Sequence, residues 1–349
     1  MSSELQDFLH DENLDGFLVL TKINRQYLSG FTGSSGMFLI TKKRMQLFVD
    51  GRYTLRAKKE SAAVVKDIDK LALELKRQKI KKLAIEDKIT LAQFGWLKVN
   101  LKGVKWEITK DIIENIRAVK TKEELKCISK GSRIIDQVFR HIAKFLKQKR
   151  GLRELDIALE IEKTGKKLGA EEMAFDPIVA FGPNAASPHH FPGKQKIGRN
   201  NFLLFDFGMK INGYHSDFTR TLFLGKPSNQ QARVYNTVLA AQQKAIEKVR
   251  IGIKASEVDK AARGFIQKKK YGKYFTHNTG HGVGLEIHEL PNFSEKSKDV
   301  LAENMIVTVE PGIYLPKKFG VRIEDMVLVS KKSRIISSLP KDLTSMIIP

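Results

Sequence analysis

Apolar and polar residues alternate along the first third of the chain in a pattern that predicts short strands separated by helices. Strand-length apolar runs occur at 16–21, 45–49, 63–65, 83–86 and 104–108, and strand-like runs flank the Gly/Ser-rich segment around 29–36. Patterns of helical period lie at 4–13, 69–79 and 90–98. Because strands that alternate with helices are typical of α/β layers, we predict a small α/β domain with a mixed sheet. Its apolar strands carry no clustered carboxylates, so we assign this domain no chemistry of its own.

The pattern changes close to residue 118. Thr121 and Glu124 form the signature of a capping box, and they precede an amphipathic helix that is predicted to end near Lys147. Further helices are predicted at 152–168, 228–250 and 255–269, and strands at 176–181, 202–208, 217–224, 305–310 and 321–329. We therefore predict an α+β protein with two domains, residues 1–118 and residues 119–349.

The segment 203–225 is the most informative part of the second domain, because it predicts a β-hairpin with an acidic residue on each arm. Asp206 and Asp217 lie eleven positions apart on the two apolar runs. An ionised carboxylate on a half-buried strand is costly unless a cation or hydrogen-bond donors meet it. The hairpin alone is compatible with a metal site and equally with two carboxylates that water solvates.

Three later segments repeat this combination of apolar strands and polar side chains. Glu310 follows one apolar strand and Glu324 lies in another, while a glycine-rich segment contains His277, His281 and His288. A single histidine of this kind is more often structural than functional. However, five of the eight histidines in the chain lie in two loops near these strands, at positions 189, 190, 277, 281 and 288. A purely structural explanation would require several independent coincidences, so the pattern favours a functional cluster.

The charges of these carboxylates indicate what the cluster binds. Four acidic side chains in one apolar interior would repel one another and lose their hydration. They are Asp206, Asp217, Glu310 and Glu324. Two divalent cations would neutralise them, with His281 as a neutral nitrogen ligand, and such metal pairs are typical of hydrolases that activate a bridging water. An oxygen-rich set with one imidazole favours Mn²⁺, then Co²⁺, with Zn²⁺ and Fe²⁺ as alternatives. Asp325 points to the opposite face of its strand and is predicted to be a strand-edge residue.

Composition and charge limit the other possibilities. The 349 residues, with 42% hydrophobic and 29% charged content, are ordinary for a globular protein. No apolar run reaches the length of a membrane span and the acidic N-terminal segment lacks the features of a secretory signal, so we predict a cytoplasmic protein without membrane association. The single cysteine, Cys127, excludes an internal disulfide. The net charge of +23 would suit nucleic acid, but the lysines are dispersed without an aromatic platform, and we predict no nucleic-acid partner.

Four motifs resemble those of the pita-bread metallopeptidases, and within them the Xaa-Pro branch, which comprises aminopeptidase P and prolidase. They are D-x-G-x4-G-Y-x-S-D-x-T-R-T from Asp206 to Thr221, H-x2-G-H-G-x-G-x3-H-E-x-P from His277 to Pro291, V-E-P-G-I-Y from Val309 to Tyr314 and G-V-R-I-E-D from Gly320 to Asp325. Segment 17–60 is similar to the N-terminal domain of the shorter members of this family. The resemblance implies a C-terminal pita-bread (creatinase/aminopeptidase) fold next to a smaller N-terminal α/β domain.

The resemblance also implies a role for each matching residue. The ligands of two divalent metal ions would be Asp206, Asp217, His281, Glu310 and Glu324. Asp217 and Glu324 would touch both ions, and Glu310 would also carry a proton from the bridging water to the leaving amine. His288 would stabilise the oxyanion of the tetrahedral intermediate. His189 would lie near the substrate, His277 would lie behind the ligands, and Arg322 would orient a carboxylate.

The resemblance leaves the choice between two Xaa-Pro activities open. A prolidase must hold the free carboxylate of a Xaa-Pro dipeptide, often with a basic residue just after the H-E-x-P motif. Asn292 occupies that position, which favours an aminopeptidase that acts on longer peptides with proline in second position. The resemblance also implies a homodimer, in which the partner subunit closes the cleft near residues 29–36. A non-catalytic nucleic-acid- or protein-binding member of the fold is the alternative of another class, motivated by the charge of +23.

Overall fold

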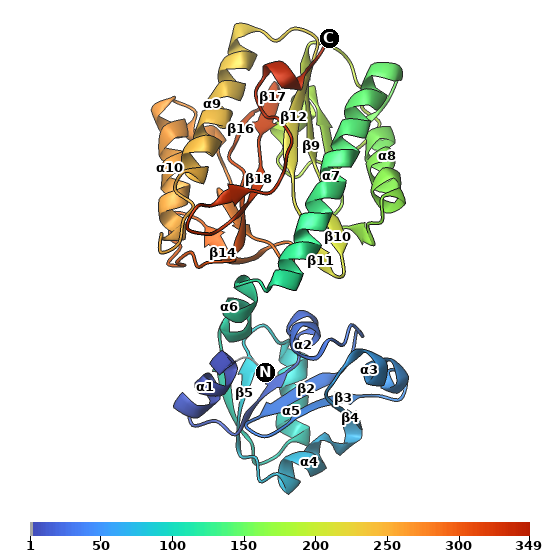
Figure 1. The fold of residues 1–349 in the computed structure, drawn as a ribbon, viewed down its shortest axis with the longest axis vertical. Helices are drawn as coiled ribbons and strands as arrows, with labels where there is room; N and C mark the ends of the chain where they lie inside the picture. The colour runs from blue at the N-terminus through green and yellow to red at the C-terminus, as the bar shows by residue number, and fades with distance from the viewer. Residues whose placement is uncertain (1–2) are drawn as a thin grey trace. The chain divides into compact units, whose positions relative to one another are not determined.

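The computed structural model describes residues 3–349, so that the first two residues of the predicted N-terminal domain lie outside the described residues. The chain divides into two compact units, one that ends at Arg117 and a second that runs from Ala118 to Pro349 (Figure 1). Each unit has its own buried apolar core. They are described separately below.

The first unit is built on one mixed sheet of six strands, as the alternation of strands and helices predicts. Its strand order is β4-β3-β2-β1-β5-β6, in which β1 pairs antiparallel with β2 and parallel with β5. The strands are β1 (Gly16–Val19), β2 (Met37–Thr41), β3 (Met45–Val49), β4 (Val64–Asp67), β5 (Lys82–Glu86) and β6 (Lys105–Thr109). The helices are α1 (Ser3–Asp11), α2 (Lys22–Ser29), α3 (Thr54–Glu60), α4 (Leu71–Arg77), α5 (Leu91–Asn100) and α6 (Ile112–Ala118). The run before the Gly/Ser-rich segment therefore forms helix α2 and not a strand.

The second unit places strands between two pairs of helices (Figure 1). The helices are α7 (Lys122–Gln148), α8 (Glu154–Lys167), α9 (Asn229–Ile246) and α10 (Ala255–Lys268). Helix α7 begins at the predicted capping box: Thr121 N donates to the Glu124 side chain over 2.7 Å, and the Thr121 side chain accepts from Glu124 N. Two larger sheets have the strand orders β20-β12-β9-β8 and β14-β13-β15-β18-β19, and smaller ribbons join β16 to β17 and β11 to β10 and β7. Their strands include β7 (Glu172–Met173), β8 (Ile178–Phe181), β13 (Gly280–Gly282), β14 (Glu289–Phe293), β19 (Arg334–Ile335) and β20 (Ile347–Ile348).

The predicted hairpin is confirmed by the pairing of β9 (Asn201–Asp206) with β12 (Thr219–Leu224). The two strands are antiparallel, and Asp206 lies opposite Thr219. The intervening residues form a smaller ribbon of β10 (Met209–Ile211) and β11 (Tyr214–His215). Asp206 is therefore the last residue of one arm, and Asp217 lies just before the other.

The predicted strand 321–329 is interrupted at the position of its first acidic residue. Strand β17 (Phe319–Arg322) pairs with β16 (Gly312–Leu315), and β18 (Asp325–Leu328) pairs with β15 (Ile306–Val309). Glu324 lies between β17 and β18, and its N–H donates to the carbonyl of Thr219 over 3.1 Å. The assignment of Glu324 to a continuous strand is thus wrong. Because both Glu324 and Glu310 lie beyond strand ends, their side chains do not have to follow the alternation of a sheet.

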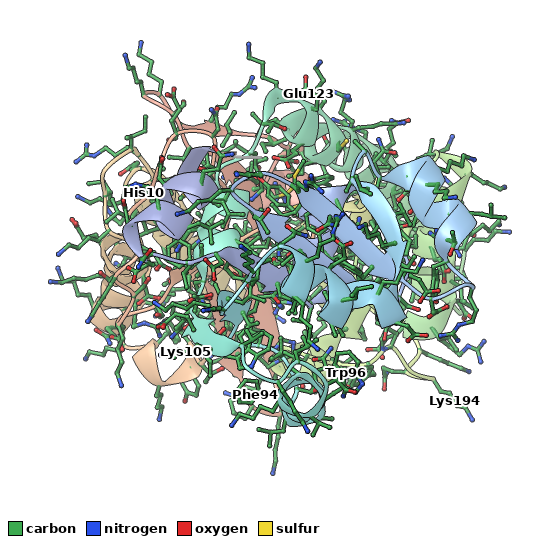
Figure 2. The ribbon with its side chains drawn as sticks, turned by 90° about the horizontal axis from the view of Figure 1, so that it is seen from below. His10, Phe94, Trp96, Lys105, Glu123 and Lys194 are labelled. Atoms are coloured by element: carbon green, nitrogen blue, oxygen red, sulfur yellow. The ribbon has the colours of Figure 1, made fainter. Side chains whose placement is uncertain are left out.

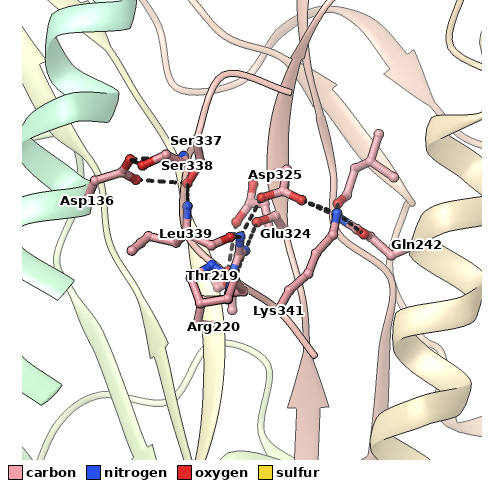
Figure 3. Close-up of polar contacts among 12 residues, drawn as sticks. Asp136, Thr219, Arg220, Gln242, Glu324, Asp325, Ser337, Ser338, Leu339 and Lys341 are labelled. Atoms are coloured by element: carbon pink, nitrogen blue, oxygen red, sulfur yellow. Dashed lines mark hydrogen bonds and ion pairs between the residues drawn. The ribbon is translucent and has the colours of Figure 1, made fainter. Parts of the chain in front are cut away.

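Asp325 is a second correction, because it is buried and not a strand-edge residue (Figure 3). Its carboxylate accepts from Arg220 Nη2 over 2.6 Å, from Lys341 Nζ over 2.6 Å and from Gln242 Nε2 over 2.8 Å. Strand β18 lies between β15 and β19, and Gln242 of α9 together with the segment around Lys341 covers this face of it. An acidic residue can be buried here because two cations, Arg220 and Lys341, compensate its charge.

The outer surface carries many of the basic residues. Lys105 and Lys194 are exposed, and their side chains extend away from the ribbon (Figure 2). On helix α5, Trp96 is 42% exposed, whereas Phe94 is partly buried against an apolar core of the first unit (Figure 2). Among the described residues, no helix combines the length and the apolar composition that crossing a membrane requires.

Candidate metal centre

A cavity of about 570 Å³ in the second unit contains every residue that the sequence nominates for chemistry. Segments that are distant in the sequence contribute to it, from the residues just before β8 to Glu324, which lies between β17 and β18. The nominated residues that line it are His189, Asp206, Asp217, His277, His281, His288, Glu310, Arg322 and Glu324. The sequence therefore predicts which side chains converge, although their 118-residue span from Asp206 to Glu324 excludes a local cluster.

The acidic side chains and His281 form the buried floor of this cavity. Ligand atoms of Asp217, His281 and Glu324 all lie within 4.8 Å of one another. His281 Nε2 is 3.2 Å from Glu310 Oε1 and 3.6 Å from Asp217 Oδ2. Groups this close and this buried interact strongly, so their charges must be compensated together.

Glycines on both sides of His281 allow the backbone to approach its neighbours. A Cβ on Gly280 would lie 2.0 Å from the carbonyl oxygen of Thr308, and one on Gly282 would lie 2.1 Å from that of Leu290. Any other residue at these positions would push β13 (Gly280–Gly282) away from β14 (Glu289–Phe293) and β15. The glycines thus set how far His281 reaches into the carboxylate cluster.

The surrounding protein does not satisfy all the carboxylate oxygens of the cluster, and divalent cations would. Asp206 Oδ1 and Glu324 Oε1 are buried and have no hydrogen-bond partner among the described residues. Burial, followed by the charge of Asp206, raises the pKa of Asp217 well above its usual value, and burial followed by the charge of Asp217 does the same for the pKa of Glu324. Lone carboxylate oxygens and an imidazole are the donors that Mn²⁺, Co²⁺ and related ions accept.

Metal binding is expected to release protons. Burial would lower the pKa of His281, but the hydrogen bond and charge of Glu310 outweigh it and raise that pKa to about 9. In the metal-free protein His281 is thus protonated at pH 7, and the raised pKa values of Asp217 and Glu324 favour their protonated forms. A metal requires the deprotonated ligands, so affinity should rise as pH increases from 6 to 9.

Calorimetric titration of the metal-free protein with Mn²⁺, in buffers of different ionisation enthalpy, measures the number of protons released. We expect at least about one proton per protein molecule at pH 7. His277 should contribute nothing to this number, because burial lowers its pKa to about 4 and its ring is already neutral at pH 7. An affinity that is independent of pH would contradict this interpretation of the cluster.

Arg322 connects the cluster to the surrounding structure. Its Nη2 pairs with Asp206 Oδ2, and its Nη1 donates to the hydroxyl of Tyr314 over 2.7 Å and to the carbonyl of Pro188 over 3.3 Å. Its Nε lies 3.3 Å from Thr219 Oγ1, which donates to Glu324 Oε2 over 2.7 Å. One guanidinium therefore restricts the rotation of the Asp206 carboxylate and, through Thr219, that of the Glu324 carboxylate.

The three nominated histidines outside the ligand cluster have different surroundings. His277 lines the cavity, and its Nε2 lies 2.8 Å from the hydroxyl of Tyr314. The ring of His288 stands edge-on to that of His281, with centroids 4.3 Å apart, and burial lowers its pKa. His189 is exposed at the mouth of the cavity. His277 and His288 are thus neutral at pH 7 and each can donate one N–H.

Three residues that contact the candidate ligands or their neighbours were not nominated from the sequence. Tyr314 joins His277 to Arg322, Thr219 holds Glu324, and Thr308 Oγ1 donates to Glu310 Oε1 over 3.2 Å. Thr219 and Tyr314 lie inside the quoted motifs, so their motif positions were a usable signal. Thr308 precedes Glu310 by two positions, near the end of the apolar strand that leads to it, and this proximity also could have identified it.

The chain is similar to known proteins over both of its units. The model of metallopeptidase family M24 matches residues 126–331, and that of the creatinase/prolidase N-terminal domain matches residues 2–119. The Xaa-Pro dipeptidase of Pyrococcus horikoshii is 37% identical over 327 residues, which are 93% of this chain and 93% of that protein. The putative Xaa-Pro aminopeptidase of Mycoplasma pneumoniae is 37% identical over 333 residues, 93% of this chain and 92% of that protein. The solved structure of the Xaa-Pro dipeptidase from Bacillus anthracis has a TM-score of 0.93 at 36% identity and covers 99% of this chain and 98% of its own.

Proposed function

This chain belongs to metallopeptidase family M24, and we propose that it removes the N-terminal residue from peptides that have proline in second position. Its family and its Xaa-Pro dipeptidase and aminopeptidase relatives support a metallo-exopeptidase. We therefore do not pursue the non-catalytic alternative. The observation that carries the proposal is the single cavity onto which four carboxylates and His281 converge.

We propose that Asp206, Asp217, His281, Glu310 and Glu324 hold two divalent ions, with Mn²⁺ the best match to the donors. When bound, such ions polarise the scissile carbonyl and lower the pKa of a water molecule. The unpaired oxygens of Asp206 and Glu324 support this ligand set. The dinuclear arrangement, the homodimer and the cytoplasmic location stay predictions.

Glu310 is proposed to move the proton during hydrolysis. Burial would raise its pKa, but the hydrogen bond and charge of His281 outweigh burial and lower it. Its carboxylate is therefore unprotonated at neutral pH in the metal-free protein, and in the loaded enzyme the charge of the ions would replace that of His281 in keeping it so. It could then accept the proton of the attacking water and deliver it to the leaving nitrogen. Thr308 fixes the orientation of Oε1 for this transfer.

His288 is proposed to donate a hydrogen bond to the oxyanion that forms on the scissile carbonyl. Its lowered pKa keeps the ring neutral, so that one ring nitrogen carries a proton and the ring adds no positive charge beside the metals. A donor that is already oriented stabilises the transition state without reorganisation. Arg322 is fully engaged with Asp206, Tyr314 and Pro188, so it orients ligands and does not bind substrate.

The charges around the cavity favour longer peptides over dipeptides. Among the described residues that line it, Arg322 is the only Lys or Arg, and its nitrogens are already bound. Asn292, which also lines it, is neutral. The free carboxylate of a Xaa-Pro dipeptide therefore lacks an ammonium or guanidinium partner. The second candidate is an Xaa-Pro dipeptidase, which is the name of some 36–37% identical relatives, while others of the same identity are named putative Xaa-Pro aminopeptidases.

A paired assay separates the two candidates. We expect the Mn²⁺-loaded enzyme to cleave a Xaa-Pro-Yaa tripeptide with a kcat/KM at least about 10-fold above that for the matching Xaa-Pro dipeptide, which equals about 1.4 kcal/mol of transition-state binding. Amidating the carboxylate of the dipeptide is the control, because it should restore cleavage if the unpaired carboxylate causes the difference. A preference for the free dipeptide would assign the chain as a prolidase.

A further inference from the structure

The loop between β8 (Ile178–Phe181) and β9 lines one side of the cavity, and a buried carboxylate outside the cavity holds it. Pro188, His189, His190 and Phe191 of this loop line the cavity. The carboxylate belongs to Glu154, the first residue of α8, which is completely buried. None of the roles proposed above uses it.

Glu154 accepts four hydrogen bonds from the two ends of the loop. Its Oε1 accepts from the N–H of Phe181 over 2.8 Å and from Nδ2 of Asn184 over 3.0 Å. Its Oε2 lies 2.8 Å from Nε2 of His190 and accepts from the N–H of Gly193 over 3.2 Å. A buried charge is tolerated when donors surround it in this way, and one carboxylate can serve all four.

The middle of the loop is held independently by β17. A Cβ on Gly320 would lie 1.9 Å from the carbonyl oxygen of Ala185, so the loop packs directly against that strand. Arg322 donates to the carbonyl of Pro188, and it also pairs with Asp206 of the proposed metal site. His189 consequently lies between Pro188, which Arg322 holds, and His190, which Glu154 holds.

We propose that Glu154 is a positioning residue for the peptide substrate: it fixes segment 181–193 so that His189 faces the peptide in the cavity. The proposal rests on the proposed function. Without Glu154, both ends of the segment lose their acceptor and only the contacts to β17 remain. Ordering the loop would then oppose peptide binding, because an interaction surface that is not preorganised must be ordered in each complex.

The substitution Glu154→Gln tests this role with little change in volume. Glutamine has one acceptor oxygen in place of two, so at least two of the four donors lose their partner. We expect kcat/KM for a Xaa-Pro-Yaa peptide to fall roughly 10- to 100-fold, with the bound metal content unchanged. Amide hydrogen exchange should become faster within 181–193 but not within the strand 203–206 that leads to a proposed metal ligand.

Glu86→Gln is the matched control, because Glu86 is a buried carboxylate with a similar number of donors in the first unit. It accepts from the N–H of Leu20 over 2.7 Å, from Nδ2 of Asn24 over 3.1 Å and from the backbone and hydroxyl of Thr21. Among the described residues, none that lines the cavity belongs to the first unit. The control should leave kcat/KM and the exchange of 181–193 unchanged.

A double-mutant cycle with His189→Ala separates positioning from general stability. If Glu154 acts through His189, Glu154→Gln should lower kcat/KM much less in the His189→Ala background than in the wild type. Full additivity, a wild-type kcat/KM and exchange rate in Glu154→Gln, or an equal loss in Glu86→Gln would each overturn the proposal.

If Glu154→Gln fails to fold, Asn184→Ala removes one of the four donors without burying an unpaired charge, and it should produce a smaller effect of the same kind. An inactive wild-type enzyme would contradict the proposed function, whereas the exchange of 181–193 would still decide the role of Glu154.

Discussion

Replacing Glu324 by glutamine is expected to abolish peptide hydrolysis and at the same time to stabilise the metal-free protein. Glutamine keeps the hydrogen bond that Thr219 donates to this side chain but removes one of the negative charges that the two proposed divalent ions would need. Loss of groups that merely orient a ligand already costs about 10- to 100-fold in activity, so loss of a ligand charge should cost at least about 100-fold. The metal content should fall with the activity.

The opposite sign for stability follows from the pKa of Glu324, which burial and the charge of Asp217 raise above its unfolded value. A carboxyl whose pKa is raised by folding stabilises the protein at low pH and destabilises it as pH rises through that pKa. A permanently neutral side chain avoids this loss at pH 7. Differential scanning calorimetry with a chelator and then with Mn²⁺ should show a higher Tm for Glu324→Gln without metal and a smaller increase on adding metal. Near wild-type turnover would refute the ligand assignment.

Replacing the adjacent residue, Asp325, by asparagine should instead destabilise the protein both with and without metal. Two cations, Arg220 and Lys341, share this one buried carboxylate, and Arg220 also donates to the backbone carbonyl of Glu324 (Figure 3). Removing one partner of a buried ion pair typically costs about 3–5 kcal/mol, because the remaining charge is left uncompensated. We expect a loss of this size in the free energy of unfolding, measured by urea denaturation.

The pH dependence of this pair has the reverse sign to that of Glu324. Burial would raise the pKa of Asp325, but the charges of Arg220 and Lys341 outweigh burial and lower it. The stability that Asp325 contributes is therefore present at neutral pH and is lost as pH falls through the folded pKa. Lys341→Met is the control: it leaves Asp325 paired with Arg220 and should cost less than Asp325→Asn. An Asp325→Asn protein that unfolds within about 1 kcal/mol of the wild type would contradict the importance of this network.

The sequence predicts some features of Glu324 and Asp325 but not the structure around them. The two side chains do lie in different surroundings, Glu324 in the cavity and Asp325 in the network with Gln242 and Lys341, although Glu324 is outside the strands. The sequence does not reveal that the strand breaks at Glu324, because the apolar pattern continues across the break. The N–H of Glu324 bonds to the carbonyl of Thr219, 105 positions away, and a contact this distant in the sequence leaves no local signal. Nor does the sequence show that Gln242 and Lys341 cover Asp325, since that depends on how a helix and the last segment pack.

Residues inside recurring motifs were easier to nominate than residues that support them. The hairpin with Asp206 was predictable because two apolar runs with turn residues between them determine the pairing locally. Glu154 reads from the sequence as an ordinary acidic residue at the start of a helix. Its four hydrogen bonds to a loop 27 to 39 positions away exist only in the folded chain.

Both tryptophans of the chain, Trp96 and Trp106, belong to the unit that ends at Arg117. Indole emission therefore reports how that unit unfolds and provides no intrinsic probe of the catalytic unit. Loading or stripping the ions could shift the melting of the second unit by many degrees while the emission stays constant. The ion-dependent stability of this enzyme has to be followed by heat capacity, tyrosine absorbance or exchange, and a constant tryptophan signal is no proof that ligands do not stabilise it.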